Sequence, residues 1–204
     1  MVQAPPGSRQ DERRREILGA AARVFRRRGF HDAGMREIAA ELDMAVGNLY
    51  YYFQNKRELL AYCQMETLDE LLASAGRIGE LEIPADGKLR RLIRSHLRSL
   101  HEGTPGSLAH LEVESLSDDW RPRVIAKRNR YERALRSLVE TGIRDGSFRP
   151  VDPGVAVRTI LGALNWTVRW YRPGGRLDLS RVETEICSLL VDGLGGQRTV
   201  ARGA

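Results

Sequence analysis

The chain has few cysteines and no long apolar segment. Its 204 residues include two cysteines, Cys63 and Cys187, which lie far apart and form no C-x-x-C pair. We therefore expect no disulfide framework, and we expect each thiol to be a small buried side chain in a reducing cytoplasm. No run of about 18 apolar residues occurs, so the sequence predicts no transmembrane helix and no membrane partner. The basic residues near the N-terminus precede no apolar stretch, so a secretory signal is not expected.

Recognisable catalytic patterns are also absent from the sequence. The chain has no Gly-rich phosphate loop, no H-E-x-x-H sequence and no evident Ser/His/Asp set. His96 and His101 are five residues apart, which is a poor spacing for two ligands of one metal ion. We therefore expect no enzyme activity, no bound metal and no cofactor.

Positive charge is concentrated near the N-terminus. The net charge is +6, and residues 8–30 contain eight arginines against three acidic residues, which gives +5 of that total. Such a concentration suits a polyanionic partner such as DNA. Taken alone, a solvated helix face is the simpler explanation of the same residues.

Helical periodicity recurs along the chain, whereas strand-like alternation does not. Gly and Pro interrupt the periodicity at intervals, which is typical of short connections between helices. The sequence therefore predicts an all-α fold. Helices are expected near residues 10–28, 35–42, 46–52, 56–79, 86–101, 106–116, 121–145, 153–171 and 180–193.

Residues 35–53, MREIAAELDMAVGNLYYYF, have the organisation of a helix-turn-helix. Two short helices joined by a tight turn place the second helix in the major groove, where all four base pairs can be distinguished. On that second helix Leu49 and Phe53 are one turn apart and are expected to face the core. The opposite face and its margins supply the candidate DNA contacts, which are Gly47, Asn48, Tyr50, Tyr51 and Tyr52.

The N-terminal quarter of the chain resembles the TetR/AcrR family. The segment GNLYYYFQNKRELL is similar to that family's motif, and R-x-x-G-F at 26–30 and M-R-E-I-A-A at 35–40 match its upstream pattern. The resemblance implies a dimer of all-α subunits. Each subunit would have a three-helix DNA-binding head and a C-terminal body that binds a small molecule and forms the dimer.

The resemblance also assigns individual DNA contacts. Arg36 matches a residue that contacts the DNA backbone, and Lys56 matches a lysine that clamps a phosphate. Asn48, Tyr50 and Tyr52 match recognition-helix positions. Three departures from the motif are Met35 for Thr, Asp43 for the turn glycine, and Ala45-Val46 for Ser-Lys. Asp tolerates a left-handed turn better than most residues, and the Arg-rich first helix could replace phosphate contacts that these departures remove.

The sequence NWTVRWYRPGG, residues 165–175, marks the candidate effector site. On a helix, Gly162, Trp166 and Trp170 form one stripe, and Ile160, Leu164 and Tyr171 form another. A helix that is apolar on two faces is buried on both sides. One face could then line a pocket while the other meets a partner subunit.

This stretch, with GIRDGSFRP at 142–150, resembles a TetR subgroup that represses steroid and fatty-acid catabolism genes and is released from DNA by acyl-CoA thioesters. The resemblance favours an acyl-CoA effector. Tryptophans would wall the acyl chain and arginines would bind the phosphates. The candidate ligand residues are Trp120, Trp166, Arg169 and Trp170, with Arg172 and Arg176 nearby. Core tryptophans and solvated arginines are an equally open explanation of each single residue.

Two C-terminal helices are expected to form a homodimer. Apolar faces near 153–171 and 180–193 could join two subunits as a four-helix bundle. The residues of these faces are Ile160, Leu164, Tyr171, Val182, Ile186, Leu189 and Leu190.

The residues and the resemblance together predict four segments. Residues 1–8 would be a disordered lead-in, 9–55 a helix-turn-helix DNA-binding domain, 56–195 a helical ligand-binding and dimerisation domain, and 196–204 a flexible tail. The predicted function is a cytoplasmic, ligand-responsive transcriptional regulator, most simply a repressor that leaves a palindromic DNA operator when a small effector binds. The alternatives are a small-molecule-binding helical protein or enzyme whose head is only structural, and an architectural nucleic-acid binder without sequence preference.

Overall fold

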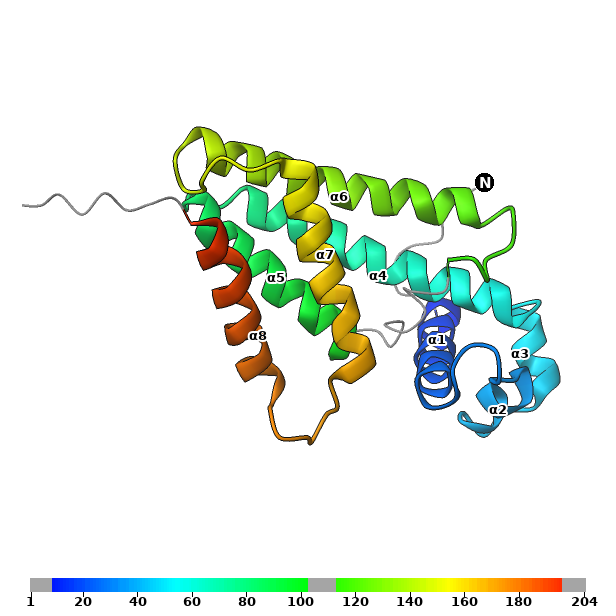
Figure 1. The fold of residues 1–204 in the computed structure, drawn as a ribbon. Helices are drawn as coiled ribbons and strands as arrows, with labels where there is room; N and C mark the ends of the chain where they lie inside the picture. The colour runs from blue at the N-terminus through cyan, green and yellow to red at the C-terminus, as the bar shows by residue number, and fades with distance from the viewer. Residues whose placement is uncertain (1–8, 103–112, 196–204) are drawn as a thin grey trace, which may run out of the picture. The chain divides into compact units, whose positions relative to one another are not determined.

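The computed structural model describes residues 9–102 and 113–195, and its regular structure in these ranges is helical (Figure 1). The all-α prediction is therefore confirmed. The helices are α1 (Arg9–Arg28), α2 (Met35–Ala40), α3 (Val46–Tyr52), α4 (Lys56–Gly79), α5 (Ala85–His101), α6 (Arg121–Arg144), α7 (Pro153–Trp170) and α8 (Leu179–Cys187), and α8 continues as the π-helical segment η2 (Ser188–Asp192).

Eight predicted helices agree with these bounds to within a few residues. The helix predicted over 106–116 lies mostly outside the described residues, and its last residues, 113–116, form turns and bends. The expected lead-in, 1–8, and tail, 196–204, also lie outside the described residues.

The chain divides into two compact units. The head unit comprises the described residues of 1–70 and 99–128, and the body unit comprises those of 71–98 and 129–204. Helices α4, α5 and α6 each contribute residues to both units.

The head unit is built on the apolar faces of α1 to α4. Ile17, Val24 and Phe25 of α1 are buried against Ile38 of α2 and Leu49 of α3. Gly29 ends α1 at a φ of +79°, a conformation in which glycine is unstrained. The turn of the helix-turn-helix contains Asp43 at a φ of +50°, so the expectation that this aspartate replaces the usual turn glycine in a left-handed conformation is confirmed.

Ion pairs fasten α2 to α1 within the head unit. The carboxylate of Glu41 accepts from Arg27 Nη2 at 2.7 Å and from Arg23 Nε at 2.9 Å, and Arg28 pairs with Glu37 at 3.0 Å. Hydrogen bonds from Arg27 and then Arg23 lower the pKa of Glu41 to about 2. Three arginines of the basic first helix are thus already paired with acidic residues of the second.

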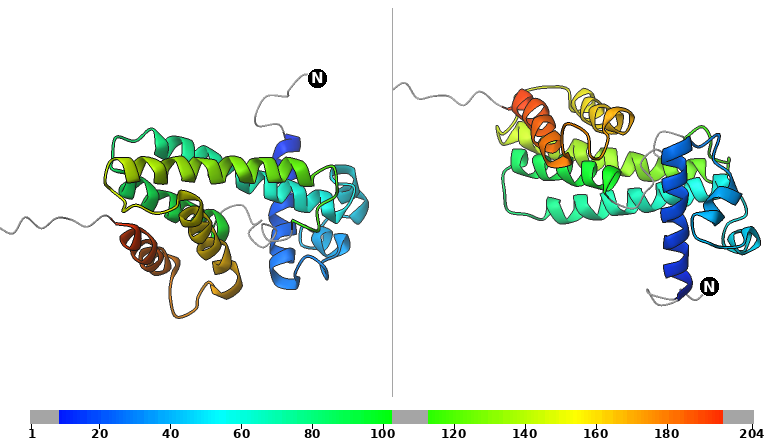
Figure 2. Two further views of the ribbon diagram at one scale, coloured as in Figure 1. Left: turned by 45° about the horizontal axis from the view of Figure 1, so that its top comes forward. Right: turned by 90° about the horizontal axis from the view of Figure 1, so that it is seen from below.

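The body unit has its own apolar core, to which α7 and α8 both contribute. These two helices lie side by side and run antiparallel (Figures 1 and 2). Ile160 and Leu164 of α7 are each 1% exposed and belong to this core, and Val182 of α8 is likewise buried, at 2% exposed. The prediction that these three residues join a partner subunit is therefore wrong, because their own subunit already covers them.

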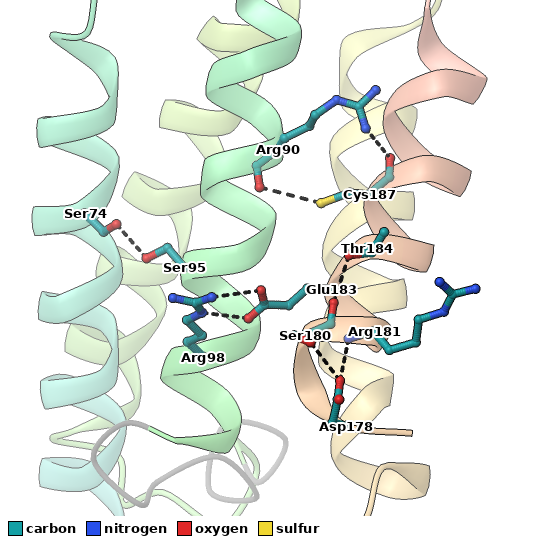
Figure 3. Close-up of polar contacts among 10 residues, drawn as sticks. All are labelled: Ser74, Arg90, Ser95, Arg98, Asp178, Ser180, Arg181, Glu183, Thr184 and Cys187. Atoms are coloured by element: carbon teal, nitrogen blue, oxygen red, sulfur yellow. Dashed lines mark hydrogen bonds and ion pairs between the residues drawn. The ribbon is translucent and has the colours of Figure 1, made fainter. Parts of the chain in front are cut away.

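Polar contacts attach α8 to α5 in the same unit (Figure 3). Arg98 donates to both carboxylate oxygens of Glu183, from Nε at 2.8 Å and from Nη2 at 3.2 Å. Arg90 donates to the carbonyl of Cys187 at 3.4 Å, and the Cys187 thiol donates back to the Arg90 carbonyl at 3.6 Å. On the other side of α5, the Ser95 and Ser74 hydroxyls are 2.6 Å apart, so a single hydrogen bond links α5 to α4 there.

Candidate functional site

Helix α3 presents one apolar and one exposed face, as its sequence predicts. Leu49 and Phe53 are buried in the head core, whereas Tyr51 is 76% exposed. Gly47 and Asn48 are exposed on the same outward side. The inward and outward faces of this helix are therefore confirmed, and its polar side is open to a large partner.

The other candidate DNA contacts differ in how exposed their side chains are. Tyr50 is exposed, and so is Arg36 on α2. Tyr52 is only half-exposed, packs against the head core, and meets the Tyr51 ring edge-on at 5.1 Å. An exposed tyrosine hydroxyl can bond a phosphate, and an exposed amide such as that of Asn48 can form a bidentate pair with adenine.

The Lys56 ammonium is directed into the head unit. It donates to three backbone carbonyls of the turn between α1 and α2: Phe30 at 3.0 Å, His31 at 2.7 Å and Ala33 at 3.2 Å. It also lies 4.8 Å from the centre of the Phe30 ring. Because an ammonium has three hydrogens, a phosphate contact would require one of these bonds to break. The geometry favours a structural role for Lys56, and its phosphate-clamp role remains only a prediction.

A variant of the capping box at the start of α4, in which the glutamate bonds the residue before the N-cap, was missed by the sequence-based predictions. The Asn55 side chain accepts from the Glu58 amide at 3.0 Å, and the Glu58 carboxylate accepts from the Gln54 amide at 2.6 Å. The signal was present in the sequence as Asn followed three residues later by Glu. The box fixes where the chain turns from the recognition helix into α4.

The candidate effector residues lie in different places. Trp120 belongs to the head unit, where its ring packs on Tyr62 at 4.9 Å. In the body unit Trp166 is 62% exposed, and Arg169 on the same helix is also exposed. A pocket of about 360 Å³ at the end of α7 brings some of the predicted residues together, and its lining is Trp170, Tyr171, Arg172, Gly175, Arg176 and Leu177.

A buried polar group in the body core was not predicted. His96 of α5 is fully buried, with Nδ1 3.2 Å from the Tyr131 hydroxyl and Nε2 3.1 Å from Asn165 Oδ1. Burial raises the pKa of the Tyr131 hydroxyl, so this phenol stays protonated. The three side chains come from α5, α6 and α7, and no sequence spacing could have brought them together.

The described part of the chain gives little support for a reactive thiol, a metal site or a membrane-spanning helix. Burial raises the pKa of the Cys63 thiol, which makes it an unreactive group. Among residues 9–102 and 113–195 there is no group of three His, Cys, Asp or Glu side chains placed to hold a metal ion. No helix in these ranges is long and apolar enough to cross a membrane.

An apolar groove of about 420 Å³ lies on the surface of the body unit. Helix α7 and segment η2 each expose a large apolar side chain here. Val155 of α7 lines the groove, and Leu189 of η2 is 75% exposed. The groove is lined by Arg149, Pro150, Val151, Asp152, Val155, Ala156, Thr159, Ile160, Leu190 and Leu194. The groove and these two side chains are therefore a candidate docking surface of the body unit.

Comparison with known families explains why these features occur in one chain. A family model described as "Bacterial regulatory proteins, tetR family" matches residues 17–63, and one described as "Tetracyclin repressor-like, C-terminal domain" matches residues 82–194. The chain belongs to the TetR family of bacterial regulatory proteins. The matched N-terminal region contains α1 from Ile17 onward and the whole of α2 and α3.

Relatives within the TetR family match nearly the whole chain. The HTH-type transcriptional repressor KstR2 of Rhodococcus jostii is 29% identical over 185 residues, covering 89% of this chain and 91% of the relative. The structure of the TetR-family regulator PfmR from Thermus thermophilus has a TM-score of 0.79 at 32% identity, covering 87% of this chain and 98% of that one. The structure of AibR in complex with isovaleryl coenzyme A and operator DNA has a TM-score of 0.78 at 27% identity, covering 88% and 98%. KstR2 and PfmR are both described as transcriptional regulators.

Proposed function

We propose that this TetR-family regulator is a homodimeric repressor that binds a palindromic operator through α3 and leaves it when an acyl-CoA thioester binds. The observation that carries the proposal is the geometry of α3. Leu49 and Phe53 hold its apolar side in the head core, while Gly47, Asn48 and Tyr51 face outward. A helix held this way can enter the major groove, and the missing Cβ at Gly47 permits close approach to the DNA.

Dimer formation through the exposed side of α7 and through η2 is supported by their surface. Val155, Thr159, Gly162 and Trp166 follow one another along α7 at helical spacing, and each is exposed. Together with Leu189 and the apolar groove they offer a partner the area that Ile160 and Leu164 cannot. A two-fold dimer also matches a palindromic operator, whose half-sites are spaced by about 34 Å or a multiple of it.

An acyl-CoA effector is supported by the chemistry of the body and by the relatives. The pocket beside Trp170 combines aromatic surface with the exposed guanidiniums of Arg172 and Arg176, a combination that suits a ligand with an apolar part and phosphates. KstR2 is a repressor, and AibR has been seen with a coenzyme A thioester and operator DNA. A regulator of this kind acts in the cytoplasm, where both DNA and CoA thioesters occur.

The DNA-binding part is tested by fluorescence anisotropy with the chain's own promoter and an unrelated duplex of equal length. We expect wild type to prefer the promoter, and Asn48→Ala to change the order of preference in a randomised DNA pool. Equal affinity for both duplexes would favour the architectural nucleic-acid binder. No binding to either duplex at low salt would favour a helical small-molecule-binding protein instead.

The effector part is tested with a panel of acyl-CoAs and free CoA. We expect a long or polycyclic acyl-CoA to release the promoter and free CoA to release it poorly, because the acyl group supplies about 25 cal/mol per Å² of buried apolar surface. A tenfold loss of operator affinity needs about 1.4 kcal/mol of coupling between the two sites. Trp170→Ala, which removes an aromatic wall of the pocket, should weaken the response without weakening DNA binding. If no acyl-CoA raises the melting temperature or releases DNA, the thioester assignment is wrong.

A further inference from the structure

Three aromatic rings in the head unit form a row from the end of α3 to the turn before α6. Phe53, which follows α3 directly, packs edge-on against Tyr62 of α4, with ring centroids 5.4 Å apart and ring planes at 75°. Tyr62 in turn packs on Trp120, with centroids 4.9 Å apart and planes at 57°. The row therefore joins the end of α3 and the nearby first turns of α4 to Trp120, which lies far along the sequence.

Two guanidinium groups flank this aromatic row. The Arg14 guanidinium of α1 lies 5.3 Å from the Tyr62 ring centre and 5.5 Å from that of Phe53, and Arg123 of α6 lies 5.1 Å from the Trp120 ring. Arg14 Nε is buried and has no hydrogen-bond acceptor. The Arg14 guanidinium therefore contacts the two rings, whereas its Nε atom contacts no acceptor. A cation above an aromatic ring is attracted by the quadrupole of that ring.

The row ends at the residue that ends the recognition helix. Phe53 has an extended backbone, with φ −144° and ψ 123°, and its amide donates to the Leu49 carbonyl at 3.0 Å. Helix α3 has seven residues and no side-chain cap at its N-terminus, where Ala45 stands. A helix this short is not stable by itself, so its position depends on the side chains that anchor it. Leu49 and Phe53 are its two fully buried anchors.

We propose that Tyr62 and Trp120 are positioning residues for operator binding. They hold Phe53 in place, and through it they connect the first turn of α6 to the orientation of α3 in the head unit. The proposal rests on the proposed function, because the angle of α3 matters only if this helix enters the groove. Trp120 is accordingly assigned to the head rather than to the effector site. Since α6 continues into the body unit, a displacement of its first turn reaches the recognition helix through three rings in contact.

The test uses the full chain and two measurements, one of which needs no DNA. Tyr62→Leu removes the central ring, and Tyr62→Phe keeps it. For Tyr62→Leu we expect faster amide hydrogen exchange in residues 46–53, with no change in α7. We also expect operator affinity to be about tenfold weaker, which corresponds to about 1.4 kcal/mol, with little change on unrelated DNA. Tyr62→Phe should match wild type in both measurements.

A second variant covers the case in which Tyr62→Leu does not fold. Trp120 is only half-buried, at the edge of the head core, so Trp120→Leu leaves the core intact. We expect it to change both measurements in the same direction, with about a threefold loss of operator affinity. Ile125→Ala, an exposed apolar residue one turn further along α6, is the control and should change neither.

Three results separate the possible failures. Wild-type exchange and affinity in both Tyr62→Leu and Trp120→Leu would overturn the proposal. Equal loss of protection in every head helix would also overturn it, because the row would then be ordinary core packing. If wild type shows no preference for its promoter, the proposed function fails, but exchange in residues 46–53 still decides whether the row positions α3.

Discussion

Adding a single methyl group at Gly142 should destabilise the body unit strongly. A Cβ on Gly142 of α6 would lie 2.3 Å from Phe148 Cδ2, 2.5 Å from Phe148 Cε2 and 2.9 Å from the Ala85 Cβ. The Phe148 ring cannot easily withdraw, because its amide donates to the Gly142 carbonyl at 2.8 Å and the next amide, of Arg149, donates to the Leu194 carbonyl at 2.9 Å. The buried ring is therefore held on both sides of its own residue.

The magnitude follows from these contacts. Overpacking of a well-packed core typically costs about 1–3 kcal/mol, and two ring atoms inside 3.0 Å place Gly142→Ala at the upper end, about 3 kcal/mol. For a chain of this length each kcal/mol lowers the melting temperature by about 2–4 °C, so we expect a decrease of about 6–12 °C. Differential scanning calorimetry of the full chain measures this directly.

The matched control is the same substitution at Gly76 of α4. Gly76 is exposed in the helix, and a Cβ there meets nothing within 4 Å. Alanine is favoured over glycine in a helix interior by about 1 kcal/mol, so Gly76→Ala should raise the melting temperature. The double variant Gly142→Ala, Phe148→Leu should recover part of the loss, because leucine lacks the ring atoms. Equal melting temperatures for Gly142→Ala and Gly76→Ala would refute the close approach of Phe148.

Three further predictions concern charges. The lowered pKa of Glu41 stabilises the fold above about pH 4.5, and this contribution should disappear as the pH falls toward about 2; Glu41→Gln should flatten the stability curve in that window, as measured by urea unfolding. Lys56→Met should lower the melting temperature and leave the salt dependence of DNA binding unchanged, whereas Arg36→Ala should reduce that slope by about one per half-site. Arg98→Met should cost about 1–3 kcal/mol because it leaves the buried Glu183 carboxylate without this partner, although Arg98 itself is exposed, and Glu183→Met added to it should restore most of the loss.

Local patterns in the sequence were enough to predict most of the head. The periodicity of Ile17, Val24 and Phe25 predicted α1, and the spacing of Leu49 and Phe53 indicated the buried side of α3. Asp43 was expected in a left-handed turn because glycine usually stands there, and its φ is +50°. Each of these properties depends on the chain within one or two helical turns.

Properties that depend on distant segments could not be predicted in the same way. The two apolar stripes of α7 were recognised, but periodicity alone could not tell that the Ile160 stripe faces the subunit's own core and the Trp166 stripe faces outward. The inward direction of Lys56 depends on three carbonyls that lie more than twenty residues earlier. Trp120 was grouped with the other tryptophans by residue type, whereas its neighbours are set by the packing of the head.

The three tryptophans are divided between the two units, so their intrinsic fluorescence can report on each unit. Trp120 is half-buried against Tyr62 in the head unit, and Trp166 and Trp170 are exposed in the body unit. Because indole emission shifts with the polarity of its surroundings, a Trp166→Phe, Trp170→Phe variant would report on the head alone. The variant Trp120→Phe would report on the body alone. Events in each unit can thus be followed with its own variant, with no dye attached to the chain.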